Sequence, residues 1–345
     1  MTDDAAIAPS LLSLFSGPGG LDIGFASAGF RTVLAVDKSD AAVRTHNAYF
    51  KSGSAVAADL VELGASGLVD MLSRRLKPGS PLGVIGGPPC QAFSRSNPFA
   101  DVDDPRNRLP MLYLEIVREL QQIYDVRFLI FENVLGIRDS KHAMTFSGIL
   151  ETLSELQFTA RVAEHSALDY GVPQDRRRII ISAFANPDEQ LRFAPEKVAR
   201  GNLTVRAAIE GLPEPAFFSR ALRPEAIPFH ANHWTMNPRS PKFADPTKRI
   251  PNSRSFRQLN WEKPSPTVAY GHREIHVHPS GHRRLSIYEA LLLQGFPKDF
   301  VFEGTFSEQV EQVSNAVPPP LARALAEAVR SALSADGHAL KVRGQ

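Results

Sequence analysis

The sequence predicts an α/β protein, in which a mostly parallel, doubly wound sheet is joined to a smaller irregular region. Three observations favour this fold. Apolar runs typical of buried strands alternate with helical patterns through the first half of the chain. Each run ends in a polar or reactive residue. The later segment 186–285 is rich in proline and histidine and has few long periodic runs, which is typical of loops.

Five strands are expected in the first half. The first, 10–15, breaks into the turn Ser16-Gly17-Pro18-Gly19-Gly20, after which a helix is expected over 21–26. The carboxyl ends of parallel strands meet at one edge of a sheet, so the residues that follow the strands should share one crevice. The other strands are 32–36, 54–58, 82–85 and 126–131, and the residues expected to converge are Gly17 to Gly20, Asp37, Asp59, Cys90 and Glu132.

Cys90 is the only cysteine and stands in the run Gly86-Gly87-Pro88-Pro89-Cys90-Gln91-Ala92-Phe93-Ser94. Glycine lets the backbone approach a ligand and proline stiffens a turn, so this loop would present the thiol from a fixed platform. Such a platform suits a nucleophile, although a lone cysteine is often an inert buried residue. The polar, turn-rich segment 94–108 is suited to closing over a pocket.

Composition sets the outer limits. The chain has 345 residues, of which 43% are hydrophobic and 22% charged, and this length suits two domains. It shows no apolar run near the roughly 20 residues of a membrane helix, and its acidic first residues differ from a signal peptide. One cysteine excludes an intramolecular disulfide, and a cytoplasmic setting is expected.

The net charge of +2 hides an asymmetry. Segment 186–285 carries 16 Lys and Arg against 9 Asp and Glu, whereas the rest of the chain is slightly acidic. This segment is expected to grip phosphates, and the alternative is a solvated basic surface. His276 and His278 have a spacing that could suit a metal, but no second cysteine or close carboxylate pair accompanies them. No metal site is expected.

The glycine turn and two acidic residues point to an adenosine ligand. Asp37 closes the second strand, where it could accept hydrogen bonds from ribose hydroxyls. Asp59 closes the third strand and could accept one from an exocyclic adenine amine. Neither position supplies a cation for phosphates, which favours an adenosine ligand without a pyrophosphate. The alternative is two ordinary carboxylates at strand ends.

Six ordered motifs resemble those of the DNA cytosine-5 methyltransferase family. The resemblance covers about residues 11 to 330 and thins between about 186 and 260, which corresponds to the family's target-recognition region. The matching segments are Phe15-Ser16-Gly17-Pro18-Gly19-Gly20, Pro88-Pro89-Cys90-Gln91, Glu132-Asn133-Val134, Gln174-Asp175-Arg176-Arg177-Arg178, the stretch from Arg284-Leu285-Ser286 to Leu293-Gln294-Gly295-Phe296-Pro297, and Asn315-Ala316-Val317.

The resemblance implies a Rossmann-like methyltransferase fold and the cofactor S-adenosylmethionine, with S-adenosylhomocysteine as product. It divides the chain into a catalytic domain (1–185), a target-recognition domain with hinge (186–309) and a C-terminal return to the catalytic domain (310–345). The residues expected at the cofactor are Phe15, Gly17, Gly19, Gly20, Leu21, Asp37, Lys38, Asp59, Leu60, Pro88 and Asn315.

The implied chemistry agrees with the residue types. A thiolate from Cys90 would add to cytosine C6 and make C5 nucleophilic. Glu132 would donate a proton or hydrogen bond at N3. In an extended strand, Arg176 and Arg178 share one face and Arg177 lies on the other, so the first two are assigned to the catalytic pocket, where a guanidinium can hold O2.

The expected partner is double-stranded DNA, from which the target cytosine must be flipped out. The chain is expected to act as a monomer in the bacterial cytoplasm, at the nucleoid and without a membrane. A restriction endonuclease, if present, would be encoded separately. The residues expected at DNA are Gln91, Ser94, Arg95, Arg106, Arg239, Arg254, Arg257 and Arg273, with Arg249 as a further candidate.

Three alternatives remain at this stage. They are methylation of tRNA, a catalytically silent DNA-binding protein, and a thiol hydrolase that uses Cys90. The hydrolase would lack an adjacent histidine and would leave the glycine turn unexplained. Two residues depart from the family pattern, since family members usually have glycine where Ser314 stands and often threonine where Ser286 stands.

Overall fold

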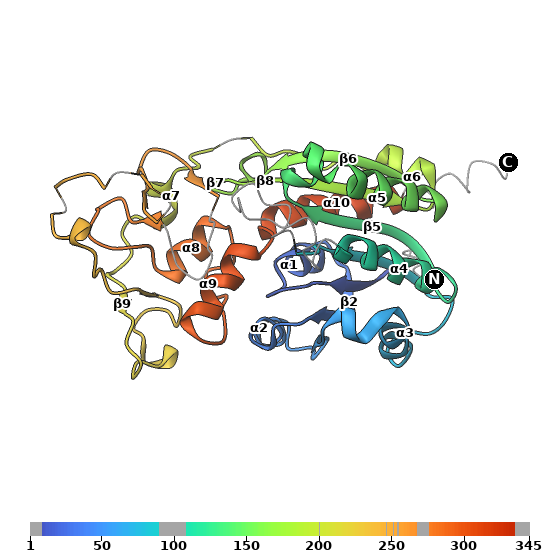
Figure 1. Cartoon of the computed structure of the whole chain (residues 1–345), viewed down its shortest axis with the longest axis horizontal. Coiled ribbons are helices and arrows are strands. Elements are labelled where there is room, and N and C mark those ends of the chain that lie inside the picture. The colour runs from blue at the N-terminus through green and yellow to red at the C-terminus, as the bar shows by residue number, and fades with distance from the viewer. Residues whose placement is uncertain are drawn as a thin grey trace, which may run out of the picture.

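The computed structural model describes residues 9–89, 108–199, 201–245, 247–250, 252–253, 255–267 and 276–334. These residues form two lobes along the long axis of the molecule (Figure 1). One lobe contains a large sheet with helices, and the other consists mainly of loops with short helices and strand pairs. In the described part of the chain, no helix is both long and apolar enough to cross a membrane.

The sheet has seven strands in the order β3-β2-β1-β4-β5-β8-β6. The neighbouring strands β3, β2, β1, β4 and β5 are parallel to one another. Strand β8 is antiparallel to both of its neighbours, β5 and β6. This arrangement confirms the mostly parallel sheet, and the five expected strands lie within two residues of their predicted ranges. The strands are β1 (Ser10–Leu14), β2 (Arg31–Asp37), β3 (Ala55–Ala57), β4 (Pro81–Gly86), β5 (Asp125–Asn133), β6 (Thr159–Ser166) and β8 (Arg177–Phe184).

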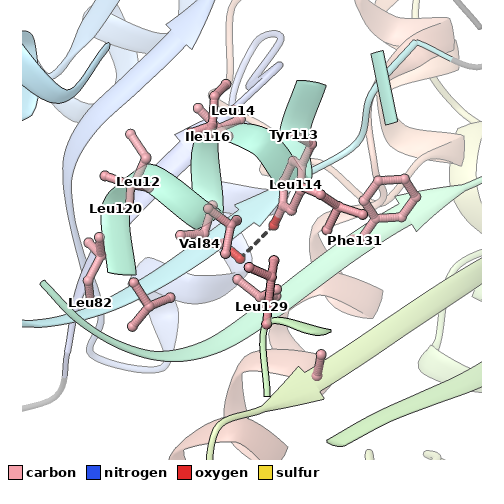
Figure 2. Packing of buried hydrophobic residues seen from close by; sticks show 14 of the residues in the cluster. Leu12, Leu14, Leu82, Val84, Tyr113, Leu114, Ile116, Leu120, Leu129 and Phe131 are labelled. Atoms are coloured by element: carbon pink, nitrogen blue, oxygen red, sulfur yellow. Dashed lines mark hydrogen bonds between the residues drawn. The ribbon is translucent and has the colours of Figure 1, made fainter. Parts of the chain in front are cut away.

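Helices cover both faces of the sheet, as a doubly wound fold requires. One face packs against α3 (Leu60–Ser73), α4 (Leu109–Gln121) and α5 (Ala143–Glu155). Figure 2 shows this core, in which the buried Tyr113 hydroxyl donates a 3.0 Å hydrogen bond to the Val84 carbonyl. Burial raises the pKa of Tyr113, so the hydroxyl stays protonated and serves as a buried donor.

The other face packs against α1 (Gly20–Ser27) and α10 (Pro319–Ser334). The two helices touch so closely that a Cβ built on Gly24 would clash with the backbone of Ala322 and Arg323. The C-terminal helix thus lies against the first helix of the chain. Helix α2 (Asp40–Phe50) follows β2, and α6 (Pro187–Arg192) packs against β8 and α10.

The second lobe is built from short elements. Its helices are α7 (Val205–Ile209), α8 (Ile287–Leu293) and α9 (Phe306–Asn315). Its two-residue strands are β9 (Ala216–Phe217), β10 (Trp234–Thr235), β11 (Arg257–Gln258) and β13 (His276–Val277), while β12 (Ser265–Pro266) pairs with β7 (Gln174–Asp175). The second lobe also contains the 3-10 turns η5 (Pro224–Ala226) and η6 (Pro241–Phe243), whereas η2 (Leu135–Arg138), η3 (Ser140–His142) and η4 (Ala167–Tyr170) belong to the sheet lobe.

A buried ion pair organises the start of α8. Arg283 is 2% exposed and donates through Nη1 and Nη2 to the two carboxylate oxygens of Glu289, at 2.9 and 2.8 Å. Glu289 also accepts the backbone N–H of Ser286, whose hydroxyl in return caps the helix by accepting the N–H of Glu289. Ser286 therefore performs the capping for which a threonine hydroxyl would also serve.

Candidate active site

The turn between β1 and α1 needs glycine for two separate reasons. Gly17 and Gly19 have φ angles of 53° and 93°, a left-handed conformation that glycine adopts without strain. Gly20 has no space for a side chain, since a Cβ there would clash with the carbonyl oxygen of Val317. Phe15, at the start of the turn, also has a positive φ of 53° and is half-buried. Leu21 is buried within α1.

Asp37 fixes this turn to the end of β2. Its Oδ2 accepts the backbone N–H of Gly17 and its Oδ1 accepts that of Ser39, both at 2.8 Å. Burial raises the pKa of Asp37, an effect that these two backbone donors oppose. The carboxyl group is thus oriented by the backbone on both sides, and its neighbour Lys38 is exposed.

Asp59 lies at the end of the third strand and caps α3, accepting the backbone N–H of Val61 at 2.9 Å. Leu60 behind it is buried. The strand register brings these ends together, because Leu14 of β1 lies beside both Val36 and Gly86. Gly86 in turn lies beside Phe131, the residue before Glu132. The expected convergence at one edge of the sheet is therefore found for the described residues.

Glu132 stands near the end of β5 and is 7% exposed. Its Oε1 lies 2.8 Å from Nε of Arg178. A Cβ built on Gly87 would come within 2.9 Å of its Oε2, so only glycine at that position leaves room for this carboxylate. The next residue, Asn133, donates from Nδ2 to the carbonyl of the buried Pro88 at 3.4 Å. The loop that leads to Cys90 thus lies directly against the Glu132–Arg178 pair.

Cys90 itself lies outside the described residues. The same is true of six residues expected at DNA, which are Gln91, Ser94, Arg95, Arg106, Arg254 and Arg273. The described residues on either side of Cys90 to Arg106 are Pro89 and Arg108, and α4 begins at Leu109.

The three consecutive arginines point in different directions. Arg177 is exposed and pairs with Glu164 and Asp175 at 3.4 Å each, whereas the side chains on either side of it turn inward. Arg178 reaches Glu132, the other residue that the sequence analysis expects beside the base. Arg176 is 1% exposed, and its Nη1 and Nη2 donate to the carbonyls of Ser314 and Asn315 at 2.9 and 3.4 Å.

Asn315 is the last residue of α9, and its side chain is exposed. Two residues later, the Val317 carbonyl lies against Gly20 at the glycine turn. The end of α9 is therefore next to the loop in which the adenosine ligand is expected.

Two of the arginines expected at DNA lie on the second lobe. Arg239 and Arg257 are both exposed. Arg257 lines an open hollow of about 390 Å³ together with Asn252, Asn260 and Lys263. One wall of this hollow is Pro266 of β12, which pairs with Asp175 immediately before Arg176. The hollow is thus joined to β7, the short strand that directly precedes the three arginines.

His276 and His278 of the second lobe are both buried. His278 lies 2.6 Å from the Ser280 hydroxyl, and its ring packs edge to face on Trp261. His276 is fully buried. Among the residues that the structure describes, no three His, Cys, Asp or Glu side chains are grouped as a metal site would need.

The model of the family of C-5 cytosine-specific DNA methylases matches residues 10–331. The chain belongs to this family. It is a DNA cytosine-5 methyltransferase, and the resemblance seen in its six motifs is confirmed. The match covers the sheet lobe, the second lobe and most of α10.

Individual relatives cover nearly the whole methyltransferase. It is 30% identical to the Type II methyltransferase M.MthTI of Methanothermobacter thermautotrophicus, over 94% of this chain and 97% of that protein. It is 33% identical to M1.HphI of Haemophilus parahaemolyticus, over 92% and 86%. A prophage-encoded protein of E. coli, described as a DNA modification methyltransferase, superposes with a TM-score of 0.72 at 26% identity over 94% and 99%.

Two residues of the site had no role in the sequence analysis. Gln294 was noted only as part of a motif, yet it is fully buried and its Nε2 donates to the Val313 carbonyl in the last turn of α9. Lys263 lines the hollow beside Arg257. A buried glutamine between apolar residues is a signal that could have been noticed, whereas a lysine in a loop carries none.

Proposed function

We propose that this methyltransferase modifies one cytosine within a short sequence of duplex DNA, that the base is flipped out of the helix, and that Cys90 forms a covalent bond to its C6. We further propose that it is the modification enzyme of a restriction-modification system, as the Type II names of its relatives suggest. The observation that carries the proposal is the buried Glu132–Arg178 pair, whose carboxylate lies against Gly87. The adjacent Asn133 donates to the Pro88 carbonyl, two residues before Cys90.

The pair suits the charge that develops on the base. When the Cys90 thiolate bonds to C6, an electron pair moves toward N3 and O2, so both atoms need a partner. Glu132 would donate a hydrogen bond or proton at N3, and Arg178 would donate to O2. Both side chains are nearly buried, where such interactions are stronger than in water. Once C5 has bonded to the methyl group, a base removes the C5 proton, and its electron pair forms the C5–C6 double bond as the S–C6 bond breaks and the thiolate is restored.

The donor site fits an adenosine compound. S-adenosylmethionine, when bound, supplies the electrophilic methyl group that C5 attacks. At Gly17 a side chain would meet nothing within 4 Å, so the backbone of the turn is open there to the close approach of a ligand. The carboxylate of Asp37 is held beside the turn by the backbone N–H groups of Gly17 and Ser39, and ribose hydroxyls could donate to it there. Asp59 would accept from the adenine amine, Pro88 and Asn315 would line the remaining sides, and Phe15, Leu21, Lys38 and Leu60 complete the proposed set.

Bisulfite sequencing of plasmid DNA tests the function. The DNA comes from a host without its own cytosine methylation that expresses either the wild-type chain or Cys90→Ala. Protection of cytosines in one short motif, absent with Cys90→Ala, is the expected result and also identifies the target sequence. Unprotected DNA from folded protein would contradict the proposal.

The covalent step has its own test. Duplex DNA that carries 5-fluorocytosine in the identified motif is incubated with the protein and S-adenosylmethionine. A competent enzyme forms an adduct that survives denaturing electrophoresis, because the fluorine cannot leave as a proton does. A protein that only binds DNA forms none, and Cys90→Ala is the control.

A further inference from the structure

The C-terminal end of α9 is held by side chains from two distant segments. The last four carbonyls of a helix have no partner within it and must find one elsewhere when they are buried. The Gln312 carbonyl accepts the N–H of Ala316 at 3.1 Å, and the Val313 carbonyl accepts Nε2 of Gln294. The remaining two, Ser314 and Asn315, accept the guanidinium of Arg176. The helix end is thus completely satisfied.

Arg176 is well placed for this task. Its backbone is fixed on both sides, since its N–H donates to the Gln174 carbonyl at 2.9 Å and its own carbonyl accepts the N–H of Ala167 at 2.8 Å. A cation at a helix C-terminus is also favoured by the helix dipole. Two N–H groups of the guanidinium are thus engaged at the end of α9.

The same helix end touches the glycine turn. From Asn315 the chain runs through Ala316 to Val317, whose carbonyl packs on Gly20. On the other side, Arg176 is two residues from Arg178, which pairs with Glu132. In Figure 1, α9 lies between the two lobes and leads into α10 beside α1. Arg176 therefore joins the strand of the base pocket to the wall of the donor site.

We propose that Arg176 is a positioning residue for the methyl donor, which acts by capping α9 and fixing Asn315 to Val317 against the glycine turn. This inference rests on the proposed function. It separates the two arginines of the motif, because Arg178 serves the base while Arg176 serves the donor and links the two sites. Binding of donor and of target DNA should consequently strengthen each other through this side chain.

Calorimetric binding of S-adenosylhomocysteine tests the inference, since it needs no turnover. Arg176→Lys replaces the planar fork, whose two nitrogens each donate to one carbonyl, with a single compact ammonium, and we expect the Kd to rise about tenfold. Arg176→Gln should raise it further. In steady-state kinetics the KM for S-adenosylmethionine should rise in the same order, while kcat at saturating donor stays within about threefold. Target duplex should tighten donor binding less in both variants than in the wild type.

Two arginines of the same motif provide matched controls. Arg177→Lys, at an exposed position, should leave every value unchanged. Arg178→Lys should lower adduct formation on 5-fluorocytosine DNA and leave the Kd for S-adenosylhomocysteine unchanged. The inference is overturned if Arg176→Lys leaves that Kd within twofold of the wild type, or if it reduces adduct formation at saturating donor as Arg178→Lys does.

Gln294→Met keeps the inference testable if the Arg176 variants do not fold. It removes the donor to the neighbouring Val313 carbonyl at similar volume, and we expect the Kd for S-adenosylhomocysteine to rise severalfold with adduct yield preserved at saturating donor. An unchanged Kd in folded Gln294→Met would contradict the inference. If the wild-type protein neither binds S-adenosylhomocysteine nor forms an adduct, the proposed function itself fails.

Discussion

Gly20 and Val317 are almost 300 residues apart in the chain, yet the Val317 carbonyl occupies the space where a side chain of residue 20 would stand. In Gly20→Ala the added Cβ would therefore clash with the Val317 carbonyl oxygen, and the backbone of the glycine turn or of Val317 must shift. We expect the free energy of unfolding to fall by about 1–3 kcal/mol, as for other overpacked sites. Urea denaturation followed by circular dichroism measures this loss.

Gly148→Ala is the matched control for that change. Gly148 lies inside α5, and a Cβ there meets nothing within 4 Å. Because alanine favours a helix over glycine, this variant should be about 0.5–1 kcal/mol more stable than the wild type. Equal effects of the two substitutions would show that the contact with Val317 does not constrain the turn.

Glu132→Gln keeps the shape of the side chain but cannot donate a proton to N3. We expect kcat to fall by about 10²- to 10⁴-fold, the range typical of general acid-base catalysis, while S-adenosylhomocysteine binds as before. Tritium transfer from labelled S-adenosylmethionine to DNA gives the rate. The control is Glu164→Gln, which changes an exposed glutamate that pairs with Arg177, and this variant should retain full activity. A rate within tenfold of the wild type for Glu132→Gln would remove Glu132 from the mechanism.

The parallel strands of the sheet could be predicted because strands buried on both faces leave continuous apolar runs. The strand β6 was not predicted, since residues such as Thr159 and Arg161 are exposed and interrupt its pattern. The alternation rule placed Arg176 and Arg178 on the inner face, and both are indeed turned inward. The alternation rule does not identify the groups that the two side chains contact. The partners of Arg176, Ser314 and Asn315, are 138 and 139 residues away in the chain.

The second lobe was less predictable for a related reason. Its stability depends on pairs such as Arg283–Glu289 and on two-residue strands, none of which produces a periodic signal. Asp37 shows a further limit of sequence reasoning. A ligand-binding role was inferred from its place after a strand, but its hydrogen bonds to the backbone of Gly17 and Ser39 depend on loop conformation.

The stability of the second lobe should depend on pH through His278. Burial lowers the pKa of His278 to about 4 from an ordinary value of 6.5. Between these values the unfolded chain binds a proton that the folded chain does not, so the free energy of unfolding falls as the pH drops from about 6.5 toward 4. We expect a loss of about 1–2 kcal/mol by pH 5 from this residue.

Tryptophan fluorescence measures this effect, since Trp261 packs on the His278 ring. A Trp234→Phe background leaves Trp261 as the sole tryptophan. In this background His278→Gln should show a smaller loss of stability between pH 7 and pH 5 than its parent. His165 has a similarly lowered pKa of about 4, so some dependence on pH will remain. Identical pH profiles for parent and His278→Gln would contradict the assignment.

Arg257 and Lys263 should contact DNA from the hollow of the second lobe. In the described part of the chain their side chains make no hydrogen bond or ion pair, whereas Lys248 pairs with Asp245. Each phosphate contact that is lost should reduce the slope of log K against log salt by about 0.9. We therefore expect Lys263→Ala to weaken binding to all duplexes and to lower this slope by about one.

Arg257→Ala distinguishes phosphate contact from base reading. If its guanidinium reads a guanine, discrimination at one position of the target should weaken by about 1–3 kcal/mol, with little change in the salt slope. If it binds phosphate, the slope falls and discrimination stays. Fluorescence anisotropy on the target and on single-base variants, from 50 to about 200 mM salt, separates these results. Lys248→Ala is the control, and if all three variants bind like the wild type, the hollow does not face DNA.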